Sequence, residues 1–131
     1  MHAKLAWSTK TVIKLVMCLR RHPDMTREQF QDYWLNSHGP FFMKNVDTMR
    51  ATRYVQSHTI TSPVNDAFRS SRDMIQEYDG VAEVWFESEE DMISAMSTPE
   101  GESLAAALLA DETNFLDHAN CSAFIVRETE L

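Results

Sequence analysis

The sequence predicts one α+β domain in which four strands and two helical regions follow one another in the order βαββαβ. Apolar and polar residues alternate with a period of two in four separate segments. Apolar residues recur at helical spacing between the first and second of these segments, and again between the third and fourth. The length of 131 residues suits a single compact domain. This order is the split βαβ or ferredoxin-like pattern, an antiparallel sheet with both helical regions on one face.

A polar break separates the first strand from the first helix. Residues 11–20 alternate and contain many β-branched members, which predicts a strand. Thr26 and Gln29 have the capping-box spacing, in which each side chain satisfies a backbone N–H group of the other residue, so a helix begins here. The buried stripe of this helix ends at His38, and Gly39 is expected to close the helix in the left-handed conformation.

The remaining elements follow from the same two periods. Residues 61–78 show no strand alternation and exceed the length of an ordinary connection, so they form either a functional loop that serves as a lid or a short helix. Pro40 suits a first helical position. The other expected elements are a short helix over residues 40–50, strands over residues 53–60, 79–88 and 121–127, and helical pieces over residues 88–96 and 102–116.

Composition excludes several classes of partner. The formal net charge of −8 disfavours nucleic acid and anionic membrane surfaces, both of which carry negative charge. No stretch approaches the ~18 to 20 apolar residues that cross a bilayer. Lys14 interrupts the apolar run near the N-terminus, which therefore reads as a strand and not as a signal peptide. We expect a soluble, cytoplasmic protein.

Motifs for cofactors and metals are missing. Cys18 and Cys121 lack the spacing of zinc ligands, and we expect both to be free thiols in a reducing compartment. The sequence contains no glycine-rich nucleotide loop, no HExxH and no GxSxG. We therefore expect no metal and no cofactor.

Two histidines fall on faces where apolar residues are expected. His38 follows Phe30 and Trp34 on the helical stripe, and His58 shares one face of a strand with Tyr54. A neutral imidazole donates at one nitrogen and accepts at the other, as a cofactor-free acid–base step requires. A cap on its own helix would account for His38 without catalysis. Parity would equally allow the face of His58 to lie in a dimer interface.

Two stretches resemble the EthD family of the dimeric α+β barrel superfamily. They are MTREQFQDYWLNSHGP, residues 25–40, and YDGVAEVWFES, residues 78–88, and the resemblance covers about residues 14–126. It implies a ferredoxin-like subunit that pairs its sheet with a second copy to form a closed barrel with the helices outside. It also implies dehydratase, cyclase or isomerase chemistry on aromatic or polyketide-like small molecules. In the family pattern, His38 matches the histidine of the His-Gly-Pro motif, and Asp79 matches the aspartate that opens the second motif.

The expected function is a cofactor-independent dehydratase or isomerase that acts on a hydrophobic, oxygenated ring compound. His58 is assigned as the base and His38 as the acid, with Asp79 as a third catalytic residue, although a turn beside Gly80 would also explain an aspartate there. A non-catalytic module that carries a hydrophobic metabolite for an oxidative degradation system is the alternative. The expected substrate walls, which would otherwise be core residues, are Tyr33, Trp34, Phe41, Tyr54 and Trp85.

Overall fold

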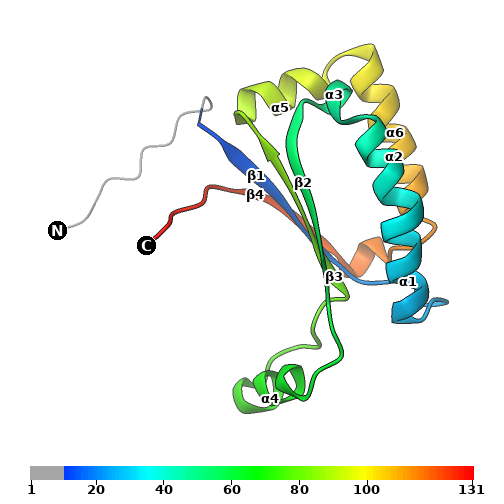
Figure 1. Ribbon diagram of the computed structural model, residues 1–131, viewed down its shortest axis with the longest axis vertical. Helices are drawn as coiled ribbons and strands as arrows, with labels where there is room; N and C mark the ends of the chain where they lie inside the picture. Colours follow the sequence, from blue (N-terminus) through cyan, green and yellow to red (C-terminus); the bar gives the residue numbers. More distant parts are fainter. Residues whose placement is uncertain (1–10) are drawn as a thin grey trace.

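A computed structural model describes residues 11–131 and confirms the α+β class (Figure 1). The described strands form one antiparallel sheet in the order β2-β3-β1-β4, which is the split βαβ topology. β2 and β4 are its edges. The strands are β1 (Ile13–Leu19), β2 (Ala51–His58), β3 (Gly80–Phe86) and β4 (Ser122–Val126).

The helices between β1 and β2 and those between β3 and β4 cover the same face of the sheet, and the other face is open (Figure 1). The first group is α1 (Arg27–Tyr33), a π-helical turn (Trp34–His38), α2 (Gly39–Lys44) and α3 (Val46–Met49). The second group is α5 (Glu89–Met96) and α6 (Pro99–Glu112), which a short 3-10 turn (His118–Asn120) follows before β4.

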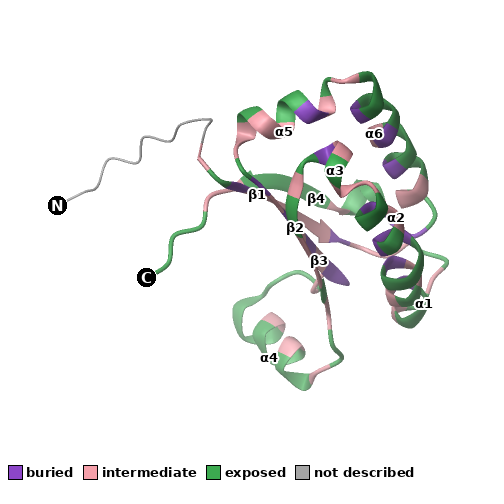
Figure 2. Cartoon of the chain, turned by 45° about the horizontal axis from the view of Figure 1, so that its top comes forward, coloured by how far each residue is buried: buried purple, intermediate pink, exposed green. Residues whose placement is uncertain are grey.

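The core lies between the sheet and this helical layer. Every second residue of β3 from Gly80 to Phe86 is buried, which is the alternation of a strand covered on one side (Figure 2). Two apolar clusters fill the layer. One surrounds Phe30 and Trp34, and the other surrounds Phe42 and Leu104.

The predicted end of the first helix at Gly39 is wrong, although the capping box at its start is confirmed. Gly39 has right-handed dihedral angles (φ −57°, ψ −52°), and the chain continues into α2 through the π-helical turn. The Trp34 carbonyl accepts both the Gly39 N–H and a hydrogen of the Gln56 side-chain amide, the latter over 2.8 Å. A Cβ atom at position 39 would lie 3.0 Å from Nε2 of Gln56. Glycine is therefore needed for a close approach and not for a left-handed backbone.

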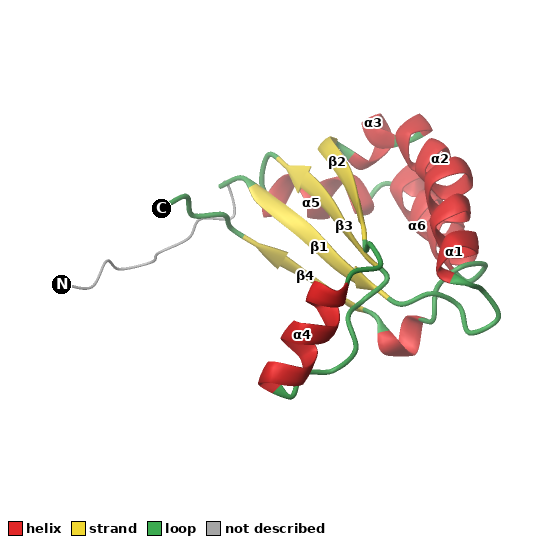
Figure 3. Cartoon of the chain, turned by 60° about the horizontal axis from the view of Figure 1, so that its bottom comes forward, coloured by secondary structure: helices red, strands yellow, loops and turns green. Residues whose placement is uncertain are grey.

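The residues 61–78 contain a helix, α4 (Pro63–Arg72), as the short-helix alternative predicted. Ser62 caps its start, and Asp73 ends it with a left-handed backbone (φ 53°). No residue of α4 is buried, and the helix stands away from the helical layer (Figures 1 and 3).

The open face of the sheet combines apolar and charged side chains. Lys14 of β1 and Glu83 of β3, which are diagonal neighbours on this face, form an ion pair at 2.6 Å. Trp85 lies on the same face, where its ring contacts Lys14 and Arg53. Cys18 also belongs to this face by alternation, and the structure records it as a free thiol.

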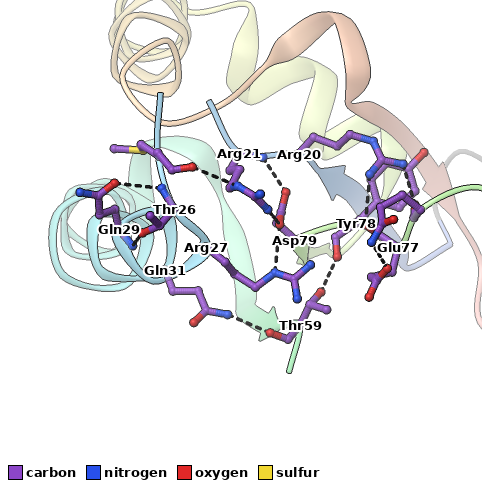
Figure 4. Close-up of polar contacts among 12 residues, drawn as sticks. Arg20, Arg21, Thr26, Arg27, Gln29, Gln31, Thr59, Glu77, Tyr78 and Asp79 are labelled. Carbon is purple, nitrogen blue, oxygen red and sulfur yellow. Dashed lines mark hydrogen bonds and ion pairs between the residues drawn. The ribbon is translucent and has the colours of Figure 1, made fainter. Parts of the chain in front are cut away.

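Asp79 joins β1, β3 and α1 through a buried ion-pair cluster (Figure 4). It is 3% exposed, and its carboxylate accepts hydrogen bonds from the Arg21 backbone at 2.9 Å, from Arg21 Nη1 at 2.6 Å and from Arg27 Nε at 3.0 Å. Burial by itself raises the pKa of Asp79, but the bonds from the two arginines outweigh it, and its pKa lies below the ordinary value of 3.8. The carboxylate is thus held as an anion.

The role of Gly39 can be tested by a double-mutant cycle. Helix propensity alone predicts that Gly39→Ala stabilises the protein by roughly 1 kcal/mol. We expect instead a loss of about 1 to 3 kcal/mol, because the added methyl group displaces the Gln56 amide from its two hydrogen bonds. In a Gln56→Ala background the same substitution should cost less, as denaturant unfolding would show. Equal costs in both backgrounds would contradict this account.

Asp79→Asn should lower the free energy of unfolding by about 1 to 3 kcal/mol, because it removes an anion that accepts hydrogen bonds from two arginines. The stabilisation from a carboxyl with a lowered pKa is fully present above its unfolded pKa and is lost as the pH falls through its lower folded pKa. The variant should therefore lose less stability than the wild type between neutral pH and pH values below about 3.8. Unfolding free energies across this range measure the difference. Asp24→Asn, an exposed carboxylate nearby, is the control and should leave the pH dependence unchanged.

Candidate functional site

A histidine and an aspartate from separate helices meet beneath the helical layer. His38, at the end of the π-helical turn, is 7% exposed, and its Nδ1 lies 2.7 Å from Oδ2 of Asp111 in α6. Tyr33 donates its hydroxyl hydrogen to Oδ1 of the same carboxylate over 2.6 Å. The ring of His38 packs on Phe115 with 4.9 Å between the centroids. The Asp111 carboxylate is thus fixed between a phenol and an imidazole.

The charge of Asp111 determines which nitrogen of the His38 imidazole carries a hydrogen. Burial raises the pKa of Asp111, but the hydrogen bonds from Tyr33 and His38 outweigh burial, and the pKa lies below its ordinary value. An ionised carboxylate only accepts hydrogen bonds, so Nδ1 of His38 carries a hydrogen. In the neutral ring, Nε2 then keeps its lone pair, and it forms no hydrogen bond within residues 11–131. Such a histidine is oriented as a base.

A small cavity lies beside this histidine, between the helices and the sheet. Its volume is about 30 Å³, and its lining includes His38, Trp34, Phe42, Tyr54 and the carboxylate-bearing Glu112. This volume accommodates water but not a ring compound. A larger ligand can therefore reach His38 only if one of the lining side chains moves.

A wider groove of about 520 Å³ lies at the edge of the sheet. Leu35, Pro40 and Met43 form its helical wall, and the strand wall is the β2 face that carries Tyr54 and His58. The volume falls within the roughly 300 to 1,000 Å³ of small-molecule sites. Tyr54 lines both the groove and the inner cavity, so its side chain separates the two spaces.

Gln56 connects the strand wall to the π-helical turn. The Trp34 carbonyl can only accept, so the Gln56 atom 2.8 Å from it is the nitrogen Nε2. The second hydrogen of Nε2 goes to the hydroxyl oxygen of Tyr54 over 2.8 Å. Tyr54 is the acceptor in that bond, and its own hydroxyl hydrogen remains available. Burial is the main cause that raises the pKa of Tyr54, so the phenol stays protonated at neutral pH.

The same amide sets the tautomer of His58. Nε2 of His58 lies 2.9 Å from Oε1 of Gln56, so this nitrogen donates and Nδ1 is the acceptor of the neutral ring. The imidazole packs on the Trp34 ring with 4.5 Å between the centroids. Burial lowers the pKa of His58, which keeps the ring neutral at physiological pH.

The structure brings most of the predicted histidine and aromatic residues to this region. Trp34 and Tyr54 line the cavity with His38, and the β2 face of His58 points at the helices and not at the open side of the sheet. Tyr33 lies behind Asp111 and contacts the site only through the carboxylate. No hydrogen bond or ring contact joins His38 to His58 within the described residues. His38 lines the inner cavity, whereas His58 lines the groove.

Three predicted site residues lie elsewhere. Asp79 is bound by Arg21 and Arg27 and has no histidine partner within the described chain. Trp85 lies on the open face of the sheet. Phe41 faces a surface hollow between α2 and α6, and its neighbour Phe42 lines the cavity in its place, because successive helical residues point about 100° apart.

Sequence reasoning did not identify Asp111 as a site residue. The signal was present, because Asp111 stands between Leu108 and Phe115 at the three- and four-residue spacings of a buried helical stripe. A carboxylate on such a stripe requires a partner. The partner is His38, which is 73 positions away in the chain.

Other classes of site have no counterpart in the described structure. Residues 11–131 contain no group of three or more histidine, cysteine, aspartate or glutamate side chains placed to hold a metal ion. None of the helices described has both the length and the apolar character that crossing a bilayer demands.

Solved structures share the fold over nearly the whole chain. An EthD family protein from Bacillus halodurans is 19% identical, with coverage of 91% of this chain and 100% of that one and a TM-score of 0.60. A dimeric ferredoxin-like protein of unknown function from Thermobifida fusca is 13% identical, with coverage of 97% and 100% and a TM-score of 0.56. A hydroxynitrile lyase from Passiflora edulis is 12% identical, with coverage of 93% and 99% and a TM-score of 0.54.

The sequence relationship is more specific than these structural likenesses. None of the curated proteins compared with the chain matches its sequence. Residues 22–119, which are well over half of the chain, match the model of the EthD domain. This match includes the π-helical turn, the β2 face and Asp111. The chain therefore belongs to the EthD family.

Proposed function

We propose that the protein is a cofactor-independent enzyme that dehydrates or isomerises a hydrophobic, oxygenated ring compound by acid–base catalysis. The observation that carries the proposal is the 2.7 Å contact between Nδ1 of His38 and Asp111. A carboxylate on Nδ1 fixes the tautomer, aims Nε2 and stabilises the imidazolium that forms when Nε2 takes a proton. His38 is therefore assigned as the base, in place of His58, for which the sequence suggested that role.

Tyr54 is assigned as the donor that stabilises developing negative charge on a substrate oxygen. Its pKa is raised and its hydroxyl hydrogen is not used in the bond from Gln56. Proton removal next to a carbonyl by His38 forms an enolate, whose oxygen needs such a donor. The His38 imidazolium then returns its proton, either to the departing hydroxyl group, which leaves as water in a dehydration, or to a neighbouring carbon in an isomerisation. His58 has a free acceptor at Nδ1 and lies on the same wall, so it orients a hydroxyl group of the bound ring.

In this proposal the substrate first occupies the groove, because the inner cavity is too small for a ring. Rotation of the Tyr54 side chain then joins the groove to the cavity and brings the reacting carbon to His38. The apolar side chains of Leu35 and Met43 suit an aromatic or polyketide-like ring. The same fold in a hydroxynitrile lyase of Passiflora edulis is compatible with acid–base chemistry on a small molecule.

A carrier of a hydrophobic metabolite is the second candidate function. The exposed Leu35 and Met43 at the mouth of the groove favour it, because they would bind an apolar ligand without any chemistry. The two functions differ at His38. A carrier has no need for an imidazole whose tautomer a buried carboxylate fixes, whereas a base requires it.

We also propose that two copies pair through their open sheet faces in the cytoplasm. The helices cover one face of the sheet, and the apolar residues of the other face need a partner (Figure 1). The Thermobifida fusca protein with this fold is described as dimeric. The free thiols of Cys18 and Cys121 suit a reducing compartment.

The assignment of His38 predicts an unusual nitrogen spectrum. We expect ¹⁵N chemical shifts to show the hydrogen on Nδ1 at a pH where the ring is neutral, because Asp111 accepts it. In Asp111→Asn this preference should be lost, since an amide can also donate. Asp91→Asn, which alters a partly exposed carboxylate paired with Arg50, is the control.

The same variants test catalysis once a substrate is found. Both His38→Ala and Asp111→Asn should lower kcat, by about 10² to 10⁴-fold for the loss of the base, with a much smaller change in KM. A wild-type ring with its hydrogen on Nε2, or turnover that survives His38→Ala, would refute the assignment.

The groove predicts a matched pair of leucine variants. Leu35, at the groove mouth, is 56% exposed and Leu109, on the outer side of α6, is 57% exposed. Leu35→Arg should weaken the binding of an apolar phenol such as 2-naphthol at least tenfold, because the charged side chain occupies the mouth. Leu109→Arg should bind it as the wild type does. NMR titration of the His58 ring reports both affinities, and equal affinities would place the ligand outside the groove.

A further inference from the structure

The apolar side chains around α4 are largely exposed to solvent in the described subunit, although the Arg72 guanidinium lies over the Phe68 ring. Val64 and Phe68, one helical turn apart, lie on one side of α4, and Ile60, Met74 and Ile75 flank the helix. Each of these five side chains is more than half exposed. Contiguous apolar surface of this kind on a soluble protein marks an interaction site.

The base of α4 is fixed by polar contacts, so its apolar side is presented in a defined position. Arg69 binds Asp66 at 2.8 Å and Glu77 at 2.7 Å. Arg20, at the end of β1, donates to the carbonyl groups of Gln76 and Glu77 and stacks on Tyr78 (Figure 4). A ten-residue helix without tertiary packing is marginally stable in water, so contacts at its base alone do not explain why it is retained.

α4 lies at the margin of the open face of the sheet. It lies beyond the ends of β2 and β3, on the side away from α1, α2 and α6 (Figures 1 and 2). A molecule that covers the open face therefore meets α4 at its margin. The residues 61–78 line neither the cavity nor the groove of their own subunit, so α4 is not a lid on that site.

We infer that α4 is an arm that docks on a second copy of this chain and completes the pairing of the open sheet faces. This inference rests on the proposed pairing. The open face by itself is partly charged, because Lys14, Glu83 and Arg53 lie at its surface. The cores of homodimer interfaces are predominantly apolar, and two copies that each carry a formal net charge of −8 repel one another. The arm adds the apolar area that the sheet lacks.

Two-fold symmetry doubles this contribution. In a closed dimer each copy presents the same surfaces, so both arms reach across and both are covered. The apolar side chains of Val16 and Val81 on the open face and of Val64 and Phe68 on the arm then belong to one continuous interface. The arm would hold the partner at the end of the sheet where β3 begins.

The test combines amide hydrogen exchange with sedimentation equilibrium on the full chain. Wild type is expected to be dimeric, with the amides of residues 65–72 protected at least tenfold over the monomer. Val81→Lys, a substitution on the open face between neutral neighbours, should produce monomers in which this protection is lost. Dilution of the wild type below its dissociation constant should give the same loss.

The arm itself is tested by Val64→Ser/Phe68→Ser, with Ile93→Ser as the control. Phe68 is 52% exposed and Ile93, on α5, is 54% exposed. The arm variant should raise the dimer dissociation constant at least tenfold, and Ile93→Ser should leave it unchanged.

Different outcomes overturn the arm and the pairing separately. A wild-type dimer in which residues 65–72 exchange freely, or an arm variant that dimerises like the wild type, overturns the arm and leaves the sheet pairing in place. A wild-type monomer at micromolar concentration overturns both. Protection of α4 that persists in monomeric Val81→Lys, or that appears only with phospholipid vesicles, also overturns the arm.

Discussion

The geometry of the site depends on the bond between the Gln56 amide and the Trp34 carbonyl. In a regular α-helix this carbonyl would accept the N–H of residue 38, whereas here it accepts the N–H of Gly39 and the side chain of Gln56. The extra residue in the turn changes the direction in which the neighbouring side chains of the helix point. His38 is thereby directed toward Asp111, and Trp34 is held against His58. Single-turn π-helices of this kind are frequent at functional sites.

Gln56 also determines which polar atoms of Tyr54 and His58 are used in hydrogen bonds within the protein. Its two donors and its acceptor are all used, and these bonds engage neither the hydroxyl hydrogen of Tyr54 nor Nδ1 of His58. A buried polar network is favourable only when each member is satisfied. The groups that remain free, which are Nε2 of His38, the hydroxyl hydrogen of Tyr54 and Nδ1 of His58, are those that the proposed chemistry uses. The groups that hold the site together are thus different from the groups to which the proposed chemistry is assigned.

The two faces of the sheet differ in the side chains and cavities that lie on them. The helical side holds the cavity, the groove and both apolar clusters, whereas the open side holds Trp85, the Lys14–Glu83 pair and the margin next to α4. At one end of the sheet, the Asp79 carboxylate binds both Arg21, just after β1, and Arg27 in α1. Its anionic state is a consequence of the hydrogen bonds from these two arginines. A carboxylate that already accepts three hydrogen bonds from two arginines, and whose pKa is lowered by them, is a weak acceptor for a proton from a substrate.

The sequence by itself determined the class and order of the elements. Strand alternation, the capping box at Thr26 and the apolar stripe of α1 are local patterns, and local sterics and burial decide them. The same patterns placed His38 on the buried stripe of the first helix, and they left open whether the shared face of Tyr54 and His58 points at the helices or at a dimer interface. What the tertiary structure decided was which of these groups meet. Asp111 reaches His38 across 73 positions, and Gly39 continues the helix because Gln56 of a distant strand bonds to the turn. Such pairings depend on how layers pack in three dimensions, and no short-range period in the chain encodes them.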